Sequence, residues 1–254
     1  MGVRRWYVAF LVALAVVALA GCVPGTVTTF SEGFGGSPLT PRWSVLNRPG
    51  DASNHEAQCY RPANVTQASG SLVITTKVDT SCGGYRYTSG MVQWTSANFT
   101  FGTLEFRARF AGGTGTWPAV WMLGASCQTS NISTADNVGT CNWPQMGSQE
   151  IDVAEILNSD ERHVHQGLIT ANDSGGCDPA ATDVSTNWHV YTLVWALDSL
   201  TWKIDGQTTC TIREHIPTTP MFVMINTAVG GAAGPIDDST LPAKTYIDYI
   251  RVTP

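Results

Sequence analysis

Apolar and polar residues alternate along most of this chain, and this alternation constrains the fold more than any other feature of the sequence. The clearest case is Thr103–Phe110, in which every second residue from Leu104 onward is apolar and the residues between them are charged. Successive side chains of a β-strand point to opposite faces, so a period of two predicts a strand that is buried on one face. The chain is therefore expected to fold into sheets.

Further segments with the same period predict that strands make up most of the chain. They are Ser71–Thr76, Ile151–Leu157, His163–Thr170, Val190–Trp195, Met221–Asn226 and Thr245–Val252. The dipeptide Asp205-Gly206 lies between Thr201–Ile204 and Thr208–Ile212 and predicts a tight hairpin turn. Many short strands with turn signals, and no convincing long helix, predict an all-β antiparallel sandwich of the jelly-roll type.

The N-terminus has the layout of a secretory signal peptide, because two arginines precede an apolar run that ends at Ala20. That run is shorter than a membrane-spanning helix requires. It closes with Leu19-Ala20-Gly21-Cys22, which resembles the bacterial lipobox and implies cleavage before a lipidated Cys22. We expect a signal peptide over residues 1–21 and a lipidated cysteine with a short tether over residues 22–29. The alternative is an ordinary cleaved signal with an incidental cysteine.

The cysteine count supports an oxidising compartment. Seven cysteines are present, and setting Cys22 aside leaves six, which can pair completely. Sequence alone leaves several connectivities open. Short loops and hairpin neighbours favour three pairs, which are Cys59–Cys82, Cys127–Cys141 and Cys177–Cys210. A zinc site is the rival interpretation, but no C-x-x-C pair supports it.

The charge balance excludes some classes of partner. Two of the 14 basic residues and none of the 20 acidic residues lie in the signal, so the mature side chains carry a balance of −8. Such a surface repels phosphate backbones, so nucleic acid is not expected as a partner. A charged fraction of 13% and nine tryptophans favour neutral, hydroxyl-rich ligands.

Three carboxylates interrupt one otherwise apolar strand, at Glu150, Asp152 and Glu155. On a regular strand Glu150 and Asp152 share one face, but Glu155 would point into the core, where an unpaired carboxylate is costly. One extra residue, a β-bulge near Val153-Ala154, would return Glu155 to the face of the other two. We therefore predict that all three carboxylates face one site.

This spacing favours catalysis. Two glutamates leaning inward could reach the separation of about 5 Å that retaining glycosidases use, where one attacks the sugar and the other protonates the leaving oxygen. Three negative charges so close together should raise the pKa of at least one carboxyl, as a general acid requires. The alternative is a calcium-binding or solvent-facing acidic strand, against which the tight alternation with apolar residues argues.

These residues carry a resemblance to a known family. Glu150-Ile151-Asp152-Val153-Ala154-Glu155 resembles the signature of glycoside hydrolase family 16 in its bulged, laminarinase-like form. Other segments also resemble that family, in the order Asn54–Tyr60, Gly115–Met122, Ala228–Gly231 and Tyr246–Val252. The resemblance implies a catalytic domain over residues 30–254, a jelly roll with a concave substrate groove, Glu150 as nucleophile, Glu155 as acid/base and Asp152 as the residue that tunes them.

The resemblance also implies which residues bind substrate. Flat indoles give sugar rings an apolar platform, and we expect this role for Trp117, Trp121 and Trp143. For Trp188, Trp195 and Trp202 we favour a place in the core. Polar residues matching family positions that line the cleft are Asn54, Glu56, Tyr60 and Arg107.

Two features bear on metals. Some family members bind calcium on the convex side through an aspartate that matches Asp248, with Glu32 as an additional candidate ligand here. A structural hydrogen bond of Asp248 is the alternative.

A histidine that the family commonly has one strand after the catalytic one is replaced around Thr170, and the nearby His163 and His165 could compensate. His163 and His165 could also form a metal-binding pair on one strand face. No third ligand is evident in the sequence, so we interpret these histidines as surface or cleft residues.

Together these observations predict a retaining endo-β-1,3-glucanase, with mixed-linkage β-1,3-1,4-glucan as a second substrate. It would need no cofactor, act as a monomer outside the cytoplasm, and contact the membrane only through its lipid, if it is not secreted freely. A β-galactan hydrolase or a transglycosylase would use the same carboxylates. A glucan-binding surface protein without turnover, or a structural lipoprotein, would belong to another class.

Overall fold

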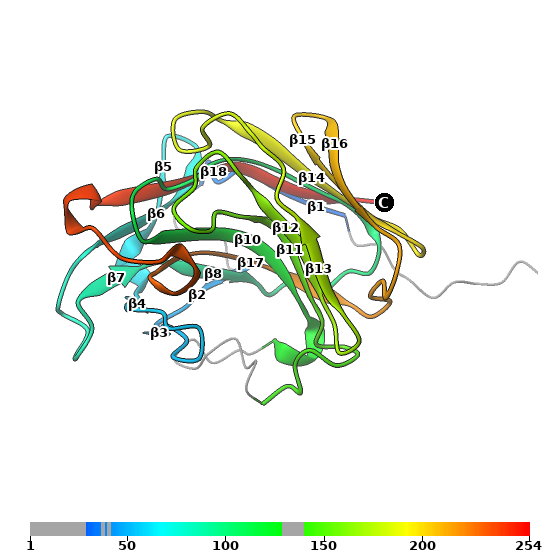
Figure 1. Cartoon of the computed structure of the whole chain (residues 1–254), viewed down its shortest axis with the longest axis horizontal. Helices are drawn as coiled ribbons and strands as arrows, with labels where there is room; N and C mark the ends of the chain where they lie inside the picture. The colour runs from blue at the N-terminus through cyan, green and yellow to red at the C-terminus, as the bar shows by residue number, and fades with distance from the viewer. Residues whose placement is uncertain (1–28, 37–38, 40–41, 129–139) are drawn as a thin grey trace, which may run out of the picture.

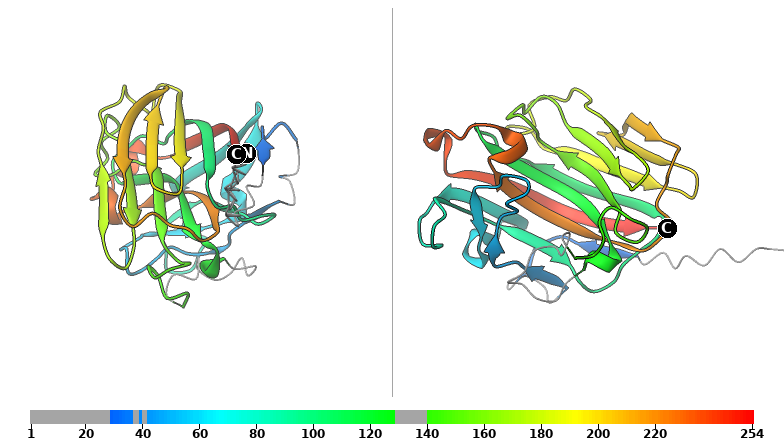
Figure 2. Two further views of the ribbon diagram at one scale, coloured as in Figure 1. Left: turned by 90° about the vertical axis from the view of Figure 1, so that its right-hand side faces the viewer. Right: turned by 60° about the horizontal axis from the view of Figure 1, so that its bottom comes forward.

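The computed structural model describes residues 29–36, 39, 42–128 and 140–254. The predicted signal peptide and Cys22 lie outside the described residues. Within them, no helix is both long and apolar enough to cross a membrane. The described residues form two packed β-sheets, and Figures 1 and 2 show them as two curved layers. The predicted all-β sandwich is confirmed.

The first sheet contains eleven strands among the described residues, with β16-β15-β14-β9-β18-β6-β7-β4-β3 as its main path. In addition, β1 pairs with β18, and β5 pairs with β6. The bounds are β1 Phe30–Glu32, β3 Arg48–Pro49, β4 Gln58–Tyr60, β5 Val65–Ala68, β6 Ser71–Val78, β7 Tyr87–Ser89, β9 Gly102–Arg109, β14 His189–Trp195, β15 Leu200–Ile204, β16 Gln207–Ile212 and β18 Ala243–Thr253.

The second sheet contains seven described strands in the order β13-β12-β11-β10-β17-β8-β2. The bounds are β2 Trp43–Val45, β8 Met91–Trp94, β10 Thr116–Gly124, β11 Glu150–Glu155, β12 His165–Ile169, β13 Ser174–Cys177 and β17 Met221–Val229. All of its pairings are antiparallel, and the short pair β4 with β7 in the first sheet is the parallel exception among the described strands. Helical residues in the described part are confined to four 3₁₀ turns, at Pro62–Asn64, Ala125–Cys127, Gly231–Ala233 and Asp238–Thr240.

The strands predicted from period two are all present, with shifts of one or two residues at most of their ends. The hairpin at Asp205-Gly206 joins β15 to β16 as expected. Strand β13 was not predicted, because its residues include Gly175 and Gly176 and are largely exposed. This strand exists because it pairs with β12, which is a tertiary relation that a local pattern does not contain.

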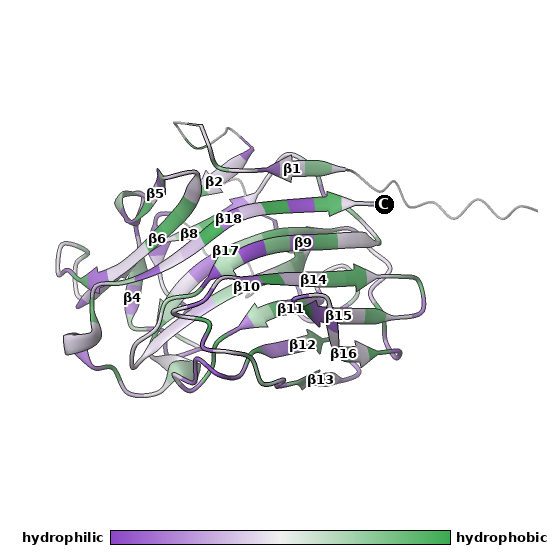
Figure 3. Ribbon diagram, turned by 90° about the horizontal axis from the view of Figure 1, so that it is seen from above, coloured by the Kyte–Doolittle hydropathy of each residue, from purple (hydrophilic) through white to green (hydrophobic). Residues whose placement is uncertain are grey.

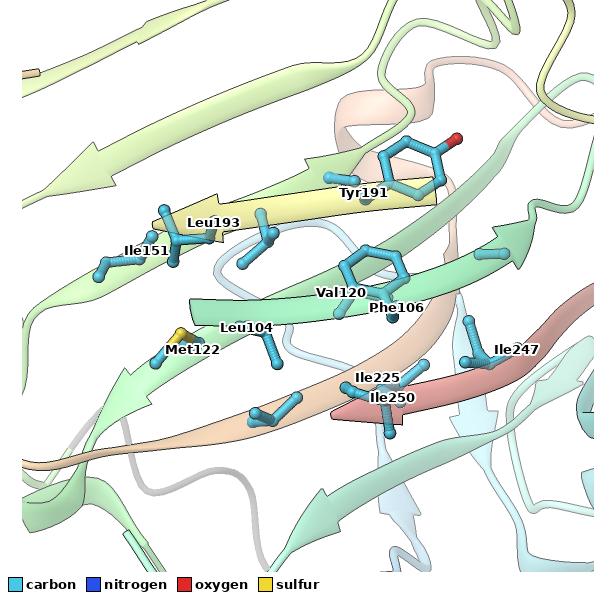
Figure 4. Packing of buried hydrophobic residues seen from close by; sticks show 14 of the residues in the cluster. Leu104, Phe106, Val120, Met122, Ile151, Tyr191, Leu193, Ile225, Ile247 and Ile250 are labelled. Atoms are coloured by element: carbon cyan, nitrogen blue, oxygen red, sulfur yellow. The ribbon is translucent and has the colours of Figure 1, made fainter. Parts of the chain in front are cut away.

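The core lies between the two sheets. Strand β9 alternates buried and half-buried residues, and Figure 3 shows hydrophobic and hydrophilic segments alternating along β9 and β18. Residues from both sheets interdigitate in this layer, as sheet-on-sheet packing requires. Figure 4 labels Leu104, Phe106, Val120, Met122, Ile151, Tyr191, Leu193, Ile225, Ile247 and Ile250 in this cluster.

The described residues contain three disulfides, and they are the three predicted pairs. Cys127–Cys141 closes the connection that follows β10 and leads toward Trp143. Cys177 lies on β13 and Cys210 on β16, with their Cα atoms 5.8 Å apart. Since β13 and β16 are the terminal strands of different sheets, this bond fastens one edge of the sandwich.

Removing the Cys177–Cys210 bond should destabilise the whole domain. The bond spans 33 residues, and loop-closure entropy for such a span corresponds to about 3–4 kcal/mol in the free energy of unfolding. We expect the double variant Cys177→Ala/Cys210→Ala to show this loss in urea unfolding. An unchanged free energy of unfolding would mean that the pairing of β12 with β13 already holds this edge.

Candidate active site

Strand β11 carries a bulge at the place where the sequence predicted one. Against β12, Asp152 is opposite Gly167 and Glu155 is opposite His165, so three steps on β11 match two on β12. The register against β10 shifts at the same place. The two bulge residues, Val153 and Ala154, are both buried in the core. Asp152 and Glu155 are thereby both left on the groove face, together with Glu150.

The bulge is held by a hydrogen bond from the opposite sheet. The indole Nε1 of Trp202, on β15, donates to the backbone carbonyl of Asp152 at 2.9 Å. Trp202 is completely buried, so this bond crosses the core. A bulge disrupts the regular ladder, and a buried carbonyl without a partner would cost free energy. The indole supplies that partner. Trp195 and Trp202 are core residues, as predicted.

The groove lies over β10, β11, β12 and β17 of the second sheet. It is lined by the three carboxylates and by most residues predicted to bind substrate, which are Asn54, Glu56, Tyr60, Trp117, Trp121 and Trp143. The residues 48–60 close one side of it, while His165 and Ile169 of β12 close the other. The catalytic strand therefore lies inside the groove, with lining residues on both of its sides.

Each of the two glutamates is oriented by an indole. Trp143 Nε1 donates to Glu150 Oε2 at 2.9 Å, and Trp117 Nε1 donates to Glu155 Oε1 at 3.0 Å. Each of these hydrogen bonds limits the rotation of the glutamate side chain that accepts it. The two tryptophans predicted as sugar platforms therefore also position the carboxylates.

The electrostatics divide the carboxyls into different roles. Burial raises the pKa of Asp152 to about 6, although His165 and a hydrogen bond with Glu150 act in the opposite direction. Burial also raises the pKa of Glu155 well above its ordinary value, and the charge of Asp152 raises it further. A carboxyl that keeps its proton near neutral pH can act as a general acid. The raised pKa of Glu155 is in the direction that this role requires.

A hydrogen-bonded chain fixes the polar residues at the other side of the groove. Trp121 Nε1 donates to Asn226 Oδ1 at 2.8 Å, and Asn226 Nδ2 donates to the Tyr60 hydroxyl at 3.0 Å. That hydroxyl donates to Glu56 Oε2 at 3.0 Å, which also accepts from the Asp51 backbone amide. Burial raises the pKa of Glu56. The hydrogen bonds hold these side chains in fixed orientations along the groove.

Among the lining residues, the sequence analysis did not name Arg48 or Asn226, and it interpreted His165 only as a surface or cleft histidine. Arg48 is buried, lines the groove and stacks 5.2 Å from the centre of the Tyr60 ring. Asn226 links Trp121 to Tyr60. His165 reaches the site because it pairs with Glu155 across β12. Only the last had a signal in the sequence, as a histidine one strand after the catalytic one.

The prediction that Arg107 lines the cleft is wrong. Arg107 lies on β9 of the other sheet and pairs with Asp248 at 2.8 Å. Its guanidinium lies 4.6 Å from the centre of the Trp188 ring, so Trp188 is half-buried on the outer face and not in the core as we expected. Alternation showed that Arg107 opposes an apolar face, but it did not show which side of the sandwich carries the groove.

The residues proposed for calcium do not form one ligand set. Asp248 is paired with Arg107, whose positive charge competes with a cation. The carboxylate of Glu32 accepts a hydrogen bond from the Phe34 amide and pairs with Arg42. The structural hydrogen bond weighed for Asp248 is therefore present. Calcium binding through Asp248 and Glu32 stays a prediction. The two carboxylates are paired with different arginines, Arg107 and Arg42.

The groove defines a class of enzyme. Two glutamates oriented by indoles, with the pKa of Glu155 raised by burial, fit acid/base and nucleophilic attack on a glycosidic bond. Residues 53–251 match the model of Glycosyl hydrolases family 16. The chain belongs to this family and is a glycoside hydrolase.

Individual relatives agree with this assignment. The chain is 29% identical to a beta-glucanase from Rhodothermus marinus, over 86% of this chain and 81% of that protein. It is 26% identical to a keratan-sulfate endo-1,4-beta-galactosidase from Sphingobacterium multivorum, over 83% of this chain and 50% of that protein. Among solved structures, the laminarinase catalytic domain from Thermotoga maritima matches with a TM-score of 0.76 and 28% identity, covering 90% of this chain and 97% of that one.

Trp202→Phe should reduce both stability and turnover, because it leaves the Asp152 carbonyl buried without its donor. We expect a loss of about 1–3 kcal/mol in the free energy of unfolding and a lower kcat. The matched control is Trp195→Phe, since Trp195 Nε1 also makes a buried bond at 2.9 Å, to the Pro217 carbonyl away from the groove. The control should lose similar stability and keep its kcat. Equal kcat in both variants would mean that the hydrogen bond from Trp202 to the bulge does not contribute to turnover.

Asp152→Asn should shift the pH profile of kcat/KM. The negative charge of Asp152 raises the pKa of Glu155, so removing that charge lowers the pKa at which the general acid loses its proton. The alkaline limb of the profile should therefore move to lower pH. An alkaline limb that stays in place or moves upward would show that Asp152 does not set the protonation of Glu155.

Proposed function

We propose that this chain is an endo-acting, retaining β-1,3-glucanase, with mixed-linkage β-1,3-1,4-glucan as a second substrate. The observation that carries the proposal is the bulge on β11, which puts Glu150, Asp152 and Glu155 on one face of a groove lined by indoles. The beta-glucanase and laminarinase relatives support a β-glucan as the substrate.

The proposed reaction has two displacement steps. Glu150 attacks the anomeric carbon while Glu155 gives its proton to the glycosidic oxygen, so that the leaving chain departs and a glycosyl-enzyme ester forms. Glu155, now ionised, then takes a proton from water, and that water displaces Glu150 from the sugar. Asp152 stands between the two glutamates, where its hydrogen bond with Glu150 and its charge near Glu155 couple the two roles.

Endo action is supported by the position of β11 within the groove. Residues of β12 line one side of the catalytic strand, and residues of β10, β17 and the segment 48–60 line the other. Such a site can bind sugar units on both sides of the bond that is cut. Trp121, in the hydrogen-bonded chain with Asn226, offers an apolar face to one of these units.

Two alternatives remain within the family. The keratan-sulfate galactosidase relative favours a β-galactan hydrolase as the second candidate, and a transglycosylase would use the same carboxylates with a sugar hydroxyl in place of water. A glucan-binding protein without turnover is disfavoured, because both glutamates are present and Glu155 is set up as an acid.

We infer that the chain works outside the cytoplasm as a monomer, without a required cofactor. Three disulfides support an oxidising compartment. The lipobox-like segment ending at Cys22 supports a lipid anchor, with the short tether keeping the enzyme close to the membrane. Labelling with a radioactive fatty acid, compared between the wild type and Cys22→Ser, tests this anchor.

The catalytic proposal predicts distinct losses for the two glutamates. Glu150→Gln should abolish the release of reducing ends from laminarin and lichenan, and Glu155→Gln should lower it by about 10²- to 10⁴-fold, as expected for loss of a general acid. Glu105→Gln is the control, because Glu105 pairs with Arg251 on the outer face, and it should remain active.

Substrate and stereochemistry are tested on the wild type. Reducing-end assays on laminarin, lichenan, agarose and xyloglucan should give release from the first two. Anomer-resolved product analysis should show the β-anomer first, since two inversions retain configuration. Release from agarose alone would favour the galactanase alternative, and early α-anomer would contradict the double displacement.

A further inference from the structure

The groove contains a convergence of ligand atoms that the hydrolytic reaction does not require. One donor atom each from Asp152, Glu155 and His165 lie within 4.8 Å of one another, and in the described part of the chain no other set of three such side chains comes this close. The three side chains are fixed by strand pairing, since His165 on β12 is directly opposite Glu155 on β11. The spacing suits three ligands around one ion.

The orientation of His165 is set from its far side. Its Nδ1 lies 2.8 Å from Asp178 Oδ1, so the other ring nitrogen, Nε2, is left for the groove. Ligand histidines in metal sites are held in this way, with a carboxylate on the nitrogen that does not bind the ion. Asp178 is two-thirds exposed and lies outside the groove lining. Asp178 therefore contacts His165 from outside the groove and does not occupy Nε2.

Two glycines make room for the imidazole. Gly167 on β12 and Gly176 on β13 are direct partners across the sheet. A Cβ on Gly167 would lie 2.8 Å from His165 Nε2 and 3.1 Å from Asp152 Oδ2, so both atoms are close to the position that a larger residue would fill. A Cβ on Gly176 would lie 3.0 Å from the His165 ring. Larger residues would push the ring away from the carboxylates.

A buried polar atom supplies independent support. Asp152 is 2% exposed and lines the groove, and its Oδ1 has no hydrogen-bond partner among the described residues. An unsatisfied buried carboxylate oxygen is costly unless a proton, a water or a cation meets it. An imidazole with two carboxylates suits Zn²⁺ and related transition ions, whereas Ca²⁺ and Mg²⁺ prefer oxygen ligands alone.

We propose that Asp152, Glu155 and His165 bind one divalent transition-metal ion of the Zn²⁺ type in the groove, and that this ion reversibly switches off cleavage. The bound cation occupies the carboxylate of Glu155 that would otherwise transfer the proton, so the general acid is blocked. Binding of the ion stands on the geometry alone. The inhibition rests on the proposed function.

The chain provides a matched control for this site. His163 precedes His165 by two residues and makes the same kind of contact, with Nδ1 at 2.8 Å from Asp160. It is half-exposed, and it does not line the groove with the carboxylates. His163→Gln therefore removes an equivalent histidine–aspartate pair without touching the three proposed ligands.

The test is calorimetric titration of Zn²⁺ into the metal-free full chain prepared without a histidine tag. We expect one ion per chain for the wild type and for His163→Gln, no comparable binding of Ca²⁺ or Mg²⁺, and at least a tenfold weaker affinity in His165→Gln. Asp178→Asn, a surface change, should weaken binding by about 10- to 100-fold, as loss of such an outer partner does. Thermal unfolding checks that each variant is folded.

Equal Zn²⁺ affinity in the wild type and His165→Gln, or no binding to the wild type, would overturn the proposal. The binding result is independent of substrate, so it decides the metal site even if no glucan is cleaved. Where glucan is cleaved, Zn²⁺ should inhibit the wild type and His163→Gln at the concentration that saturates the site. Inhibition that persists unchanged in His165→Gln would place the inhibitory ion elsewhere.

Discussion

The bulge in β11 is the constraint on which the active site depends. A regular strand would turn Glu155 into the core, where a carboxylate among apolar side chains is unstable. The extra residue lets Val153 and Ala154 both face the core, and it shifts the register with β12 between Asp152 and Glu155. Trp202 satisfies the Asp152 carbonyl from the opposite sheet. The catalytic geometry is therefore tied to the packing of the two sheets and not to β11 alone.

Burial around the bulge also determines the chemistry. The same desolvation that makes Asp152 and Glu155 costly to ionise raises the pKa of both carboxyls, which is the direction that general-acid chemistry requires. Hydrogen bonds from Trp117 and Trp143 keep the two glutamates from turning away. The site thus combines low solvent access with fixed donors, which is the condition under which electrostatic effects on a reaction are strongest.

The edge formed by β12 and β13 places an imidazole beside the carboxylates of the groove. Because Gly167 and Gly176 have no side chains, His165 can lie beside the acid pair while Asp178 holds its other nitrogen. This arrangement brings Asp152 and Glu155 together with an imidazole that the proposed hydrolytic steps do not use. It also shows how a weakly patterned strand can matter for a site, since β13 contributes bare backbone where bulk would displace the ring.

The sequence by itself determined the sheet class, because a period of two in segments such as Thr103–Phe110 leaves an apolar face that only sheet packing can bury. It also determined the bulge, because three carboxylates on one strand could share a face in no other way. It did not determine which face of the sandwich forms the groove, and Arg107 was therefore misplaced. The roles of Trp202, Asn226 and His165 were likewise decided only by the tertiary structure. Each depends on which strands lie opposite one another, and the pairing of distant strands is set by the packing of the whole core.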